Sequence, residues 1–103
     1  MIAEMLSRGR GRAVPLTALC EATGKGEREV RKQISRERLA GALILSAMEN
    51  GGGYYLPANG AEVRSFARSM AHRAAETMTI ARLAEDAAAD LDGQTMLEGW
   101  QNG

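Results

Sequence analysis

Five side chains that can hydrogen-bond phosphates or base edges fall within one short stretch of the chain. They are Arg28, Arg31, Lys32, Ser35 and Arg36. Their spacing of three and four residues places them on one face of a helix. Arginine can hydrogen-bond guanine edges, and lysine and arginine both pair with phosphates. The pattern indicates either a nucleic-acid-binding surface or the solvated face of an ordinary amphipathic helix.

A helix over 27–40 must position these side chains. Val30 and Ile34 form an i,i+4 pair that would face a core, and Gly41 would end the helix. A shorter helix before it, through Leu19, would stop at Gly24 in a left-handed cap. The turn of residues 24–26 carries Lys25, which adds a cation beside the longer helix. The order is a short helix, a tight turn and a basic helix.

A glycine-tipped hairpin is expected next. Residues 43–45 and 54–56 are short β runs around the turn cluster of residues 50–53, and Pro57 ends the second run. The loop of residues 47–53 should be mobile. Asn50 and Tyr54 are the candidates for nucleic-acid contact in this hairpin. By strand alternation, one of the two adjacent tyrosines must face inward, and the other either contacts a nucleic-acid backbone or shields the core.

The N-terminal segment carries three more arginines. Residues 1–8 are predicted to form a short amphipathic helix, because Ile2, Met5 and Leu6 recur at helical spacing. Glycines then separate the arginines of the following loop, Arg8, Arg10 and Arg12. They form either a mobile arm for phosphates or a minor groove, or a soluble loop between elements.

A long C-terminal helix is expected to begin after Asn59, a good N-cap, with Glu62 in a capping-box position. An apolar stripe then recurs at helical spacing: Val63, Phe66, Met70, Ala74, Met78 and Ala81. The helix should end near Ala89. Its distal half either pairs with a second copy of the chain or frays. Residues 90–103, with Trp100, read as a flexible tail or as a docking peptide.

Composition sets the broad class. The chain has 103 residues, with 45% hydrophobic and 4% aromatic residues, which predicts one mainly helical domain. Residues 1–60 hold nine Lys/Arg and six Asp/Glu, a net of +3, and the remainder is −3. No long apolar run or signal peptide is evident, so no membrane partner is expected. The single Cys20 agrees with a reducing compartment, and we expect the protein to be cytoplasmic.

Catalysis has little support in the sequence. His72 is the single histidine and has no evident acid or cysteine partner. One Cys and one His cannot make a zinc site, and residues 24–26 lack the full phosphate-loop pattern. We therefore expect no enzyme activity, no metal or other cofactor, and no small-molecule ligand.

Three stretches carry a family resemblance: residues 28–34, residues 41–46 and Gly53-Tyr-Tyr-Leu-Pro57. They resemble winged helix-turn-helix proteins of the biotin-repressor type, most of all small prophage-encoded relatives of Gram-positive bacteria. The likeness covers about residues 14–85. It implies DNA binding through Arg28, Arg31, Lys32 and Ser35 and through the wing near residues 51–54.

Two positions depart from that family. A leucine usually stands three positions after the residue matching Ile34, but this chain has Glu37 there. A buried, unpaired carboxylate is costly, so Glu37 is expected to be exposed or paired with Arg8 or Arg38. The wing tip also lacks Lys and Arg. No ligase domain follows, so biotin chemistry is not implied.

These patterns together predict a mainly α fold with a small β-hairpin. A winged helix-turn-helix domain over residues 1–58 would be followed by a long helix over residues 59–89 and a tail over residues 90–103. We expect double-stranded DNA binding by a small phage- or prophage-type regulator or replication accessory protein. The alternative is a winged-helix protein–protein interaction module that uses the long helix and tail.

Overall fold

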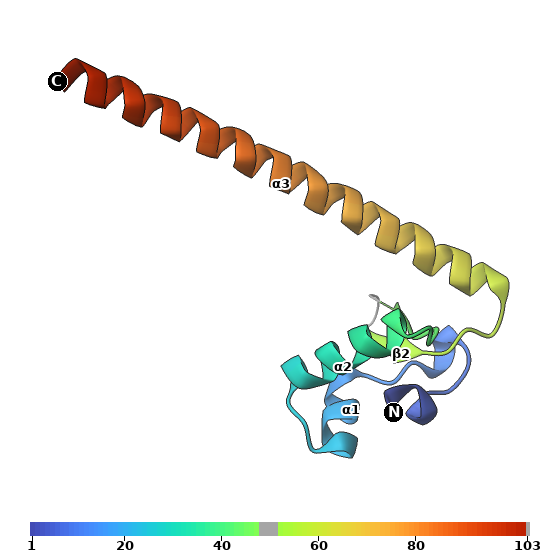
Figure 1. Ribbon diagram of the computed structural model, residues 1–103. Coiled ribbons are helices and arrows are strands. Elements are labelled where there is room, and N and C mark those ends of the chain that lie inside the picture. Colours follow the sequence, from blue (N-terminus) through green and yellow to red (C-terminus); the bar gives the residue numbers. More distant parts are fainter. Residues whose placement is uncertain (48–51, 103) are drawn as a thin grey trace. The chain divides into compact units, whose positions relative to one another are not determined.

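The structure is a computed structural model that describes the backbone of residues 1–47 and 52–102 and the side chains of residues 1–47 and 52–94. The chain divides into two compact units, Met1–Ala67 and Arg68–Gly103, which we call the head and the stalk. The elements in order are η1 (Ile2–Met5), η2 (Arg10–Arg12), α1 (Leu16–Thr23), α2 (Glu27–Leu39), β1 (Leu45–Ala47), β2 (Gly53–Tyr55) and α3 (Gly60–Asn102) (Figure 1). The described chain is therefore mainly helical, with a small antiparallel hairpin and a long C-terminal helix.

Helices α1 and α2 confirm the predicted short helix, tight turn and longer basic helix. Gly24 adopts a left-handed conformation with φ of 71°, and its N–H donates to the Cys20 carbonyl at 2.8 Å. This hydrogen bond closes the end of α1 as a glycine cap. Val30 and Ile34 are buried on the inner side of α2. They join Leu19 in the main core of the head, so the two helices are held together by apolar packing.

The hairpin has a different side chain environment on each face. Leu45 pairs with Tyr55 and Ser46 with Tyr54 in an antiparallel register. The first strand thus begins two residues later than predicted. Leu45 and Tyr55 belong to a second core cluster, against which Phe66 packs, whereas Tyr54 packs on the main core. The two faces of the hairpin therefore pack on different clusters, one of which includes Phe66 from the start of α3.

The predicted helix over residues 1–8 is wrong. The chain forms a 3₁₀ turn over Ile2–Met5 and then extends. The Leu56 N–H donates to the Ser7 carbonyl at 2.9 Å, and the Gly9 N–H donates to the Leu56 carbonyl at 2.7 Å. Backbone pairing along the free edge of β2 therefore replaces the second helical turn, while Ile2 and Leu6 still reach the core.

Glu37 is buried, with 7% of its surface exposed. We expected an exposed Glu37 or an ion pair with Arg8 or Arg38, and neither is found. Its carboxylate accepts hydrogen bonds from the Ile2 and Ala3 N–H groups at 2.9 Å and from the Gln33 amide at 3.0 Å. Burial raises the pKa of this carboxyl, but those hydrogen bonds outweigh burial and leave the pKa below its usual value. The carboxylate thereby anchors the N-terminal turn to α2.

The start of α3 confirms the predicted cap. The Asn59 side-chain oxygen accepts the Glu62 N–H at 2.9 Å. Glu62 reaches back to the Ala58 N–H rather than to the cap residue itself. The first turns of α3 belong to the head because Phe66 packs on the hairpin, so the head extends beyond the predicted domain end at residue 58.

Helix α3 continues to Asn102 rather than ending near Ala89. Residues 84–92 include four alanines, one leucine and one glutamate, all strong helix formers, and a glycine such as Gly93 costs only about 1 kcal/mol relative to alanine. A helix already under way can therefore pass through it. The Trp100 side chain, which we expected in a flexible tail or docking peptide, lies outside the described side chains. Within the described residues, no helix is both long and apolar enough to cross a membrane.

Candidate nucleic-acid interface

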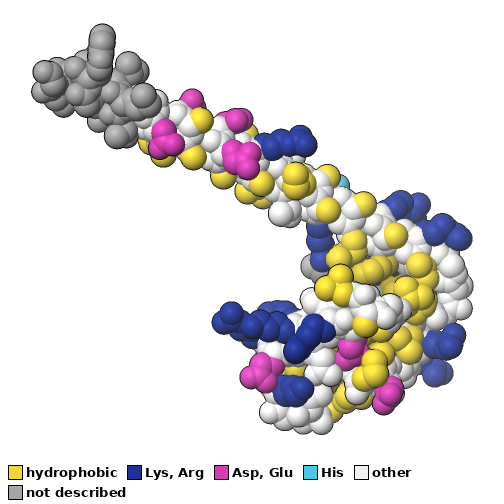
Figure 2. Space-filling model, viewed as in Figure 1, with side chains coloured by type: hydrophobic (Ala, Val, Ile, Leu, Met, Phe, Trp, Pro, Cys, Tyr) yellow, Lys and Arg dark blue, Asp and Glu magenta, His cyan; other side chains and the backbone are white. Residues whose placement is uncertain are grey.

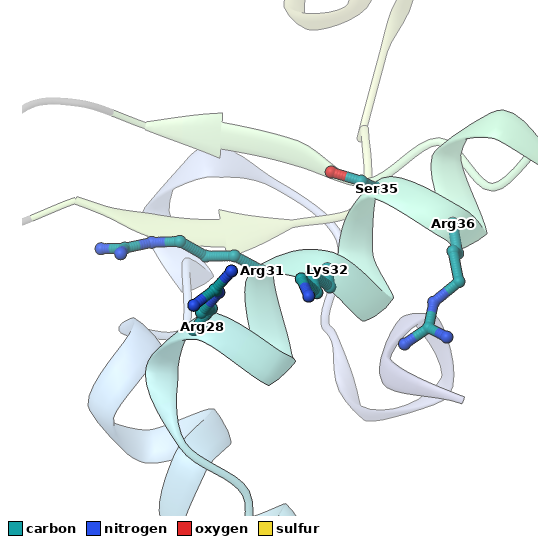
Figure 3. A pocket seen from close by; sticks show the side chains of 5 residues that line it. All are labelled: Arg28, Arg31, Lys32, Ser35 and Arg36. Carbon is teal, nitrogen blue, oxygen red and sulfur yellow. The ribbon is translucent and has the colours of Figure 1, made fainter.

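A shallow hollow lies along the outer face of α2. It has a volume of about 640 Å³ and is lined by five predicted residues: Arg28, Arg31, Lys32, Ser35 and Arg36. We call this set the cationic face. Figure 3 shows the Arg28, Arg31 and Lys32 side chains close together on the N-terminal turns of α2, with Arg36 projecting further along the helix. The structure thus brings together the five residues that helical spacing placed on one face.

The cationic face is open to solvent. All five lining residues are exposed, while Val30, Ile34 and Glu37 on the other side of α2 are buried. In the space-filling view, Lys and Arg side chains gather over the α2 part of the head (Figure 2). Because the apolar side of α2 is occupied by the core, the cationic face lies on the side of this helix that is open to a partner.

The charge balance on the exposed part of α2 is positive. Four cations line the hollow, and Glu27 and Glu29 are the exposed carboxylates of the first turn. Arg31 lies 4.0 Å from Glu27, with side chains 62% and 57% exposed. A pair this exposed is screened by water and contributes little stability. The Arg31 guanidinium can therefore exchange Glu27 for a more highly charged acceptor such as phosphate.

Lys25, another predicted nucleic-acid contact, does not belong to the cationic face. Its ammonium donates to the Gln33 side-chain oxygen at 2.8 Å, and the amide of Gln33 in turn donates to Glu37. These bonds connect the turn before α2 to the buried carboxylate and the N-terminal segment. Lys25 thus lies on the flank of α2, beside the cationic face rather than within it.

Arg10 and Arg12 lie on a 3₁₀ turn, η2, within the segment for which we considered a mobile arm or a soluble loop. The Arg10 N–H donates to Glu62 at 3.0 Å, and Val14 and Tyr54 exchange two backbone hydrogen bonds of 2.8 Å. Hydrogen bonds from the Ala58 and Arg10 N–H groups, with the charge of Arg10, hold the pKa of Glu62 below its usual value. Both arginine side chains remain exposed, but their backbone is held at the edge of the hairpin.

The hairpin residues contribute mostly to packing. Tyr55 is buried and Tyr54 is half-buried, so Tyr55 is the tyrosine that faces inward, and Tyr54 shields the main core. Asn50 and Gly51 of the predicted wing tip lie outside the described residues.

Arg38 has a structural role that the sequence pattern did not reveal. Its Nε donates to the Ile44 carbonyl at 2.7 Å. Its guanidinium carbon lies 5.0 Å from the centre of the Phe66 ring and 5.9 Å from that of Tyr54, within the range of cation–π attraction. The arginine therefore links the end of α2 to both aromatic rings. Residues so far apart in the chain carry no common spacing that would have identified the cluster.

His72 has an acidic neighbour that the sequence analysis missed. Its Nε2 lies 3.0 Å from Glu76, one helical turn away. Both side chains are well exposed, at 74% and 63%, which is typical of a surface i,i+4 pair. Among the described residues, no group of three or more Cys, His, Asp or Glu is arranged to hold a metal ion. The cationic face is the stronger candidate for a functional site.

Comparisons with known proteins found no family model that matches the chain, and no curated protein or solved structure that is similar to it. The resemblance to biotin-repressor-type winged helices therefore stays a prediction, carried by the residues quoted for it.

Proposed function

We propose that the head is a winged helix-turn-helix domain that binds double-stranded DNA. In this proposal α2 enters the major groove, α1 supports it, and the β1–β2 hairpin is the wing. The observation that carries the proposal is the exposed cationic face of α2 opposite a fully packed apolar side. A recognition helix needs this division, because one side must hold the helix rigid while the other meets the groove.

The residues of the cationic face would contact different parts of the DNA according to their position on α2. Arg28 and Arg31 stand on the first turns of α2, the part of a recognition helix that reaches deepest into the groove. They are suited to guanine edges. Lys32 and Arg36 are suited to phosphates, and the Ser35 hydroxyl to the flanking backbone.

The segment before α1 would add backbone contacts. Arg10 and Arg12 lie on a turn that is hydrogen-bonded to Glu62 and to the edge of β2. An ordered turn loses less conformational entropy on binding than a mobile arm does. The proposed biological role is that of a small phage- or prophage-type regulator or replication accessory protein.

The direct test is the affinity of the full chain for a fluorescently labelled duplex at low salt, measured by anisotropy. Replacing Arg31 and Lys32 together by alanine should weaken binding at least tenfold, since each phosphate or base contact is worth about 1 kcal/mol or more. The matched control exchanges the two residues, Arg31→Lys with Lys32→Arg. It keeps the charge and should retain most of the non-specific affinity.

A second candidate function rests on the stalk. Four large apolar side chains of the stalk, Met70, Met78, Ile80 and Leu83, are 39–66% exposed. Such exposure favours association with a protein, as expected of an interaction module. If the full chain binds no duplex at low salt, the DNA-binding proposal is wrong and protein association through the stalk takes its place.

A further inference from the structure

Helix α3 carries a seven-residue repeat. Ala67, Ala74, Ala81 and Ala88 recur every seven residues, and Met70, Thr77, Ala84 and Leu91 stand three residues after each of them. These are the a and d positions of a coiled coil. Every one of these residues is exposed. Small side chains at all a positions would allow a second helix to approach closely.

The charges along α3 are segregated, and this segregation determines an orientation. Residues 63–75 contain Arg64, Arg68 and Arg73 and no acid, whereas residues 83–92 contain four acids and no Lys or Arg. A parallel pair of such helices would place like charges together. An antiparallel pair would place each arginine segment beside the acidic segment of the other copy, which is favourable.

One antiparallel register satisfies both the size pattern and the charge pattern. It sets Ala67 opposite Leu91 and Met70 opposite Ala88, so that a large side chain always meets a small one. Ala74 then faces Ala84, and Thr77 faces Ala81.

In an antiparallel coiled coil, the e positions of the two helices face each other beside the a and d seam. In the same register they place Arg64 of each copy opposite Asp92 of the other copy. Met78 and Ile80 lie next to the two-fold axis, where each is close to its own symmetry mate. The exposed Met78 and Ile80, 54% and 66% exposed in the single chain, would thereby become covered.

We propose that α3 pairs in this antiparallel register with α3 of a second copy of the chain. The pairing differs from one that sets two reading heads side by side on a palindrome. At 1.5 Å per residue, the two Gly60 residues would lie roughly 57 Å apart along the axis. The inference is independent of DNA binding, because it rests on α3.

Two measurements on the full chain test the pairing. Sedimentation equilibrium should give a dimer. In a Cys20→Ser background, spin labels at Ser65→Cys should lie roughly 42 Å apart along the axis. A parallel pair would hold them near the interaxial distance of about 10 Å plus the label arms.

Charge reversal supplies a matched control. Arg64→Glu should raise the dissociation constant of the dimer roughly tenfold, because two symmetry-related pairs turn from attractive to repulsive. Adding Asp92→Arg should restore dimerisation, since the facing residues are again of opposite charge. A monomer at every concentration, a short label distance, or no rescue by the double variant would overturn the antiparallel pairing. A monomer that still binds duplex DNA would overturn the antiparallel pairing and leave the proposed DNA binding intact.

Discussion

The head and the stalk are stabilised in opposite ways. The head buries Ile2, Leu19, Ile34 and Leu45 almost completely, and its shape depends on contacts between residues distant in sequence. In the stalk, the described side chains of residues 68–94 are exposed, apart from the half-buried Gly93. Its helix depends on local propensity and on side-chain pairs one turn apart such as His72–Glu76. The difference indicates that the head presents a surface already formed, whereas the stalk leaves its apolar side chains exposed in the single chain.

The largest expected effect is on the free energy of unfolding of the head, and it is measured with one matched pair of substitutions, one in each unit. Ile34 is 2% exposed and Ile80 is 66% exposed. Ile34→Ala should lower the free energy of unfolding of the head by about 2–5 kcal/mol, because it removes buried methyl groups and leaves a cavity. Ile80→Ala should change it by less than about 0.5 kcal/mol. Urea unfolding, followed through NMR signals of Tyr55, measures the head itself. Equal losses in the two variants would contradict the contrast.

A smaller effect is expected from Glu37→Gln. The glutamine oxygen can accept the Ile2 and Gln33 donors, but its NH₂ group would then face the Ala3 N–H. An unsatisfied buried donor costs about 1–3 kcal/mol. Glu29→Gln, on the exposed first turn of α2, is the charge-matched control and should be nearly neutral.

The Glu37 effect should depend on pH. Because the folded-state pKa of Glu37 lies below its usual value, the stabilisation is fully present above the unfolded pKa of about 4.3. It is lost as the pH falls through the lower folded-state pKa. The stability difference between the native protein and the Gln variant should thus shrink on acidification below about pH 4. A difference that is constant from neutral pH to pH 2 would show that Glu37 does not act as a carboxylate.

The smallest expected effect lies in the stalk. A Cβ added at Gly93 meets nothing within 4 Å, so Gly93→Ala should stabilise α3 by up to about 1 kcal/mol. On heating, circular dichroism should show that the variant retains more helix than the native protein, while the unfolding of the head stays unchanged. Gly11→Ala, equally unobstructed but located in η2, should leave the helix signal of α3 as it is. A change in head stability on Gly93→Ala would mean that the two units unfold together.

Local patterns predicted the elements whose causes are local. The apolar spacing of Val30 and Ile34, the glycine after α1 and the Asn59 cap all act within one or two turns. The sequence therefore located α1, α2, the hairpin and the start of α3. The five residues of the cationic face were found for the same reason, since a helical face follows from spacing alone.

The errors came from interactions that span the chain. Ile2 reaches Glu37 across 35 positions, and Arg10 reaches Glu62 across 52. These hydrogen bonds hold the segment for which a helix was predicted and the turn that carries Arg10. No local pattern predicts that a glutamate on α2 will accept hydrogen bonds from backbone N–H groups at the start of the chain.

The salt dependence of duplex binding tests the proposed DNA interface most directly. If Lys32, Arg36, Arg10 and Arg12 each neutralise one phosphate, the logarithm of the binding constant should fall with the logarithm of salt with a slope of about −3.6. Changing Arg31 and Lys32 together to alanine should flatten that slope by about 0.9, the share of Lys32, because Arg31 is assigned to a base edge. No duplex binding at low salt, or an unchanged slope in the double variant, would contradict a DNA-binding role for the cationic face.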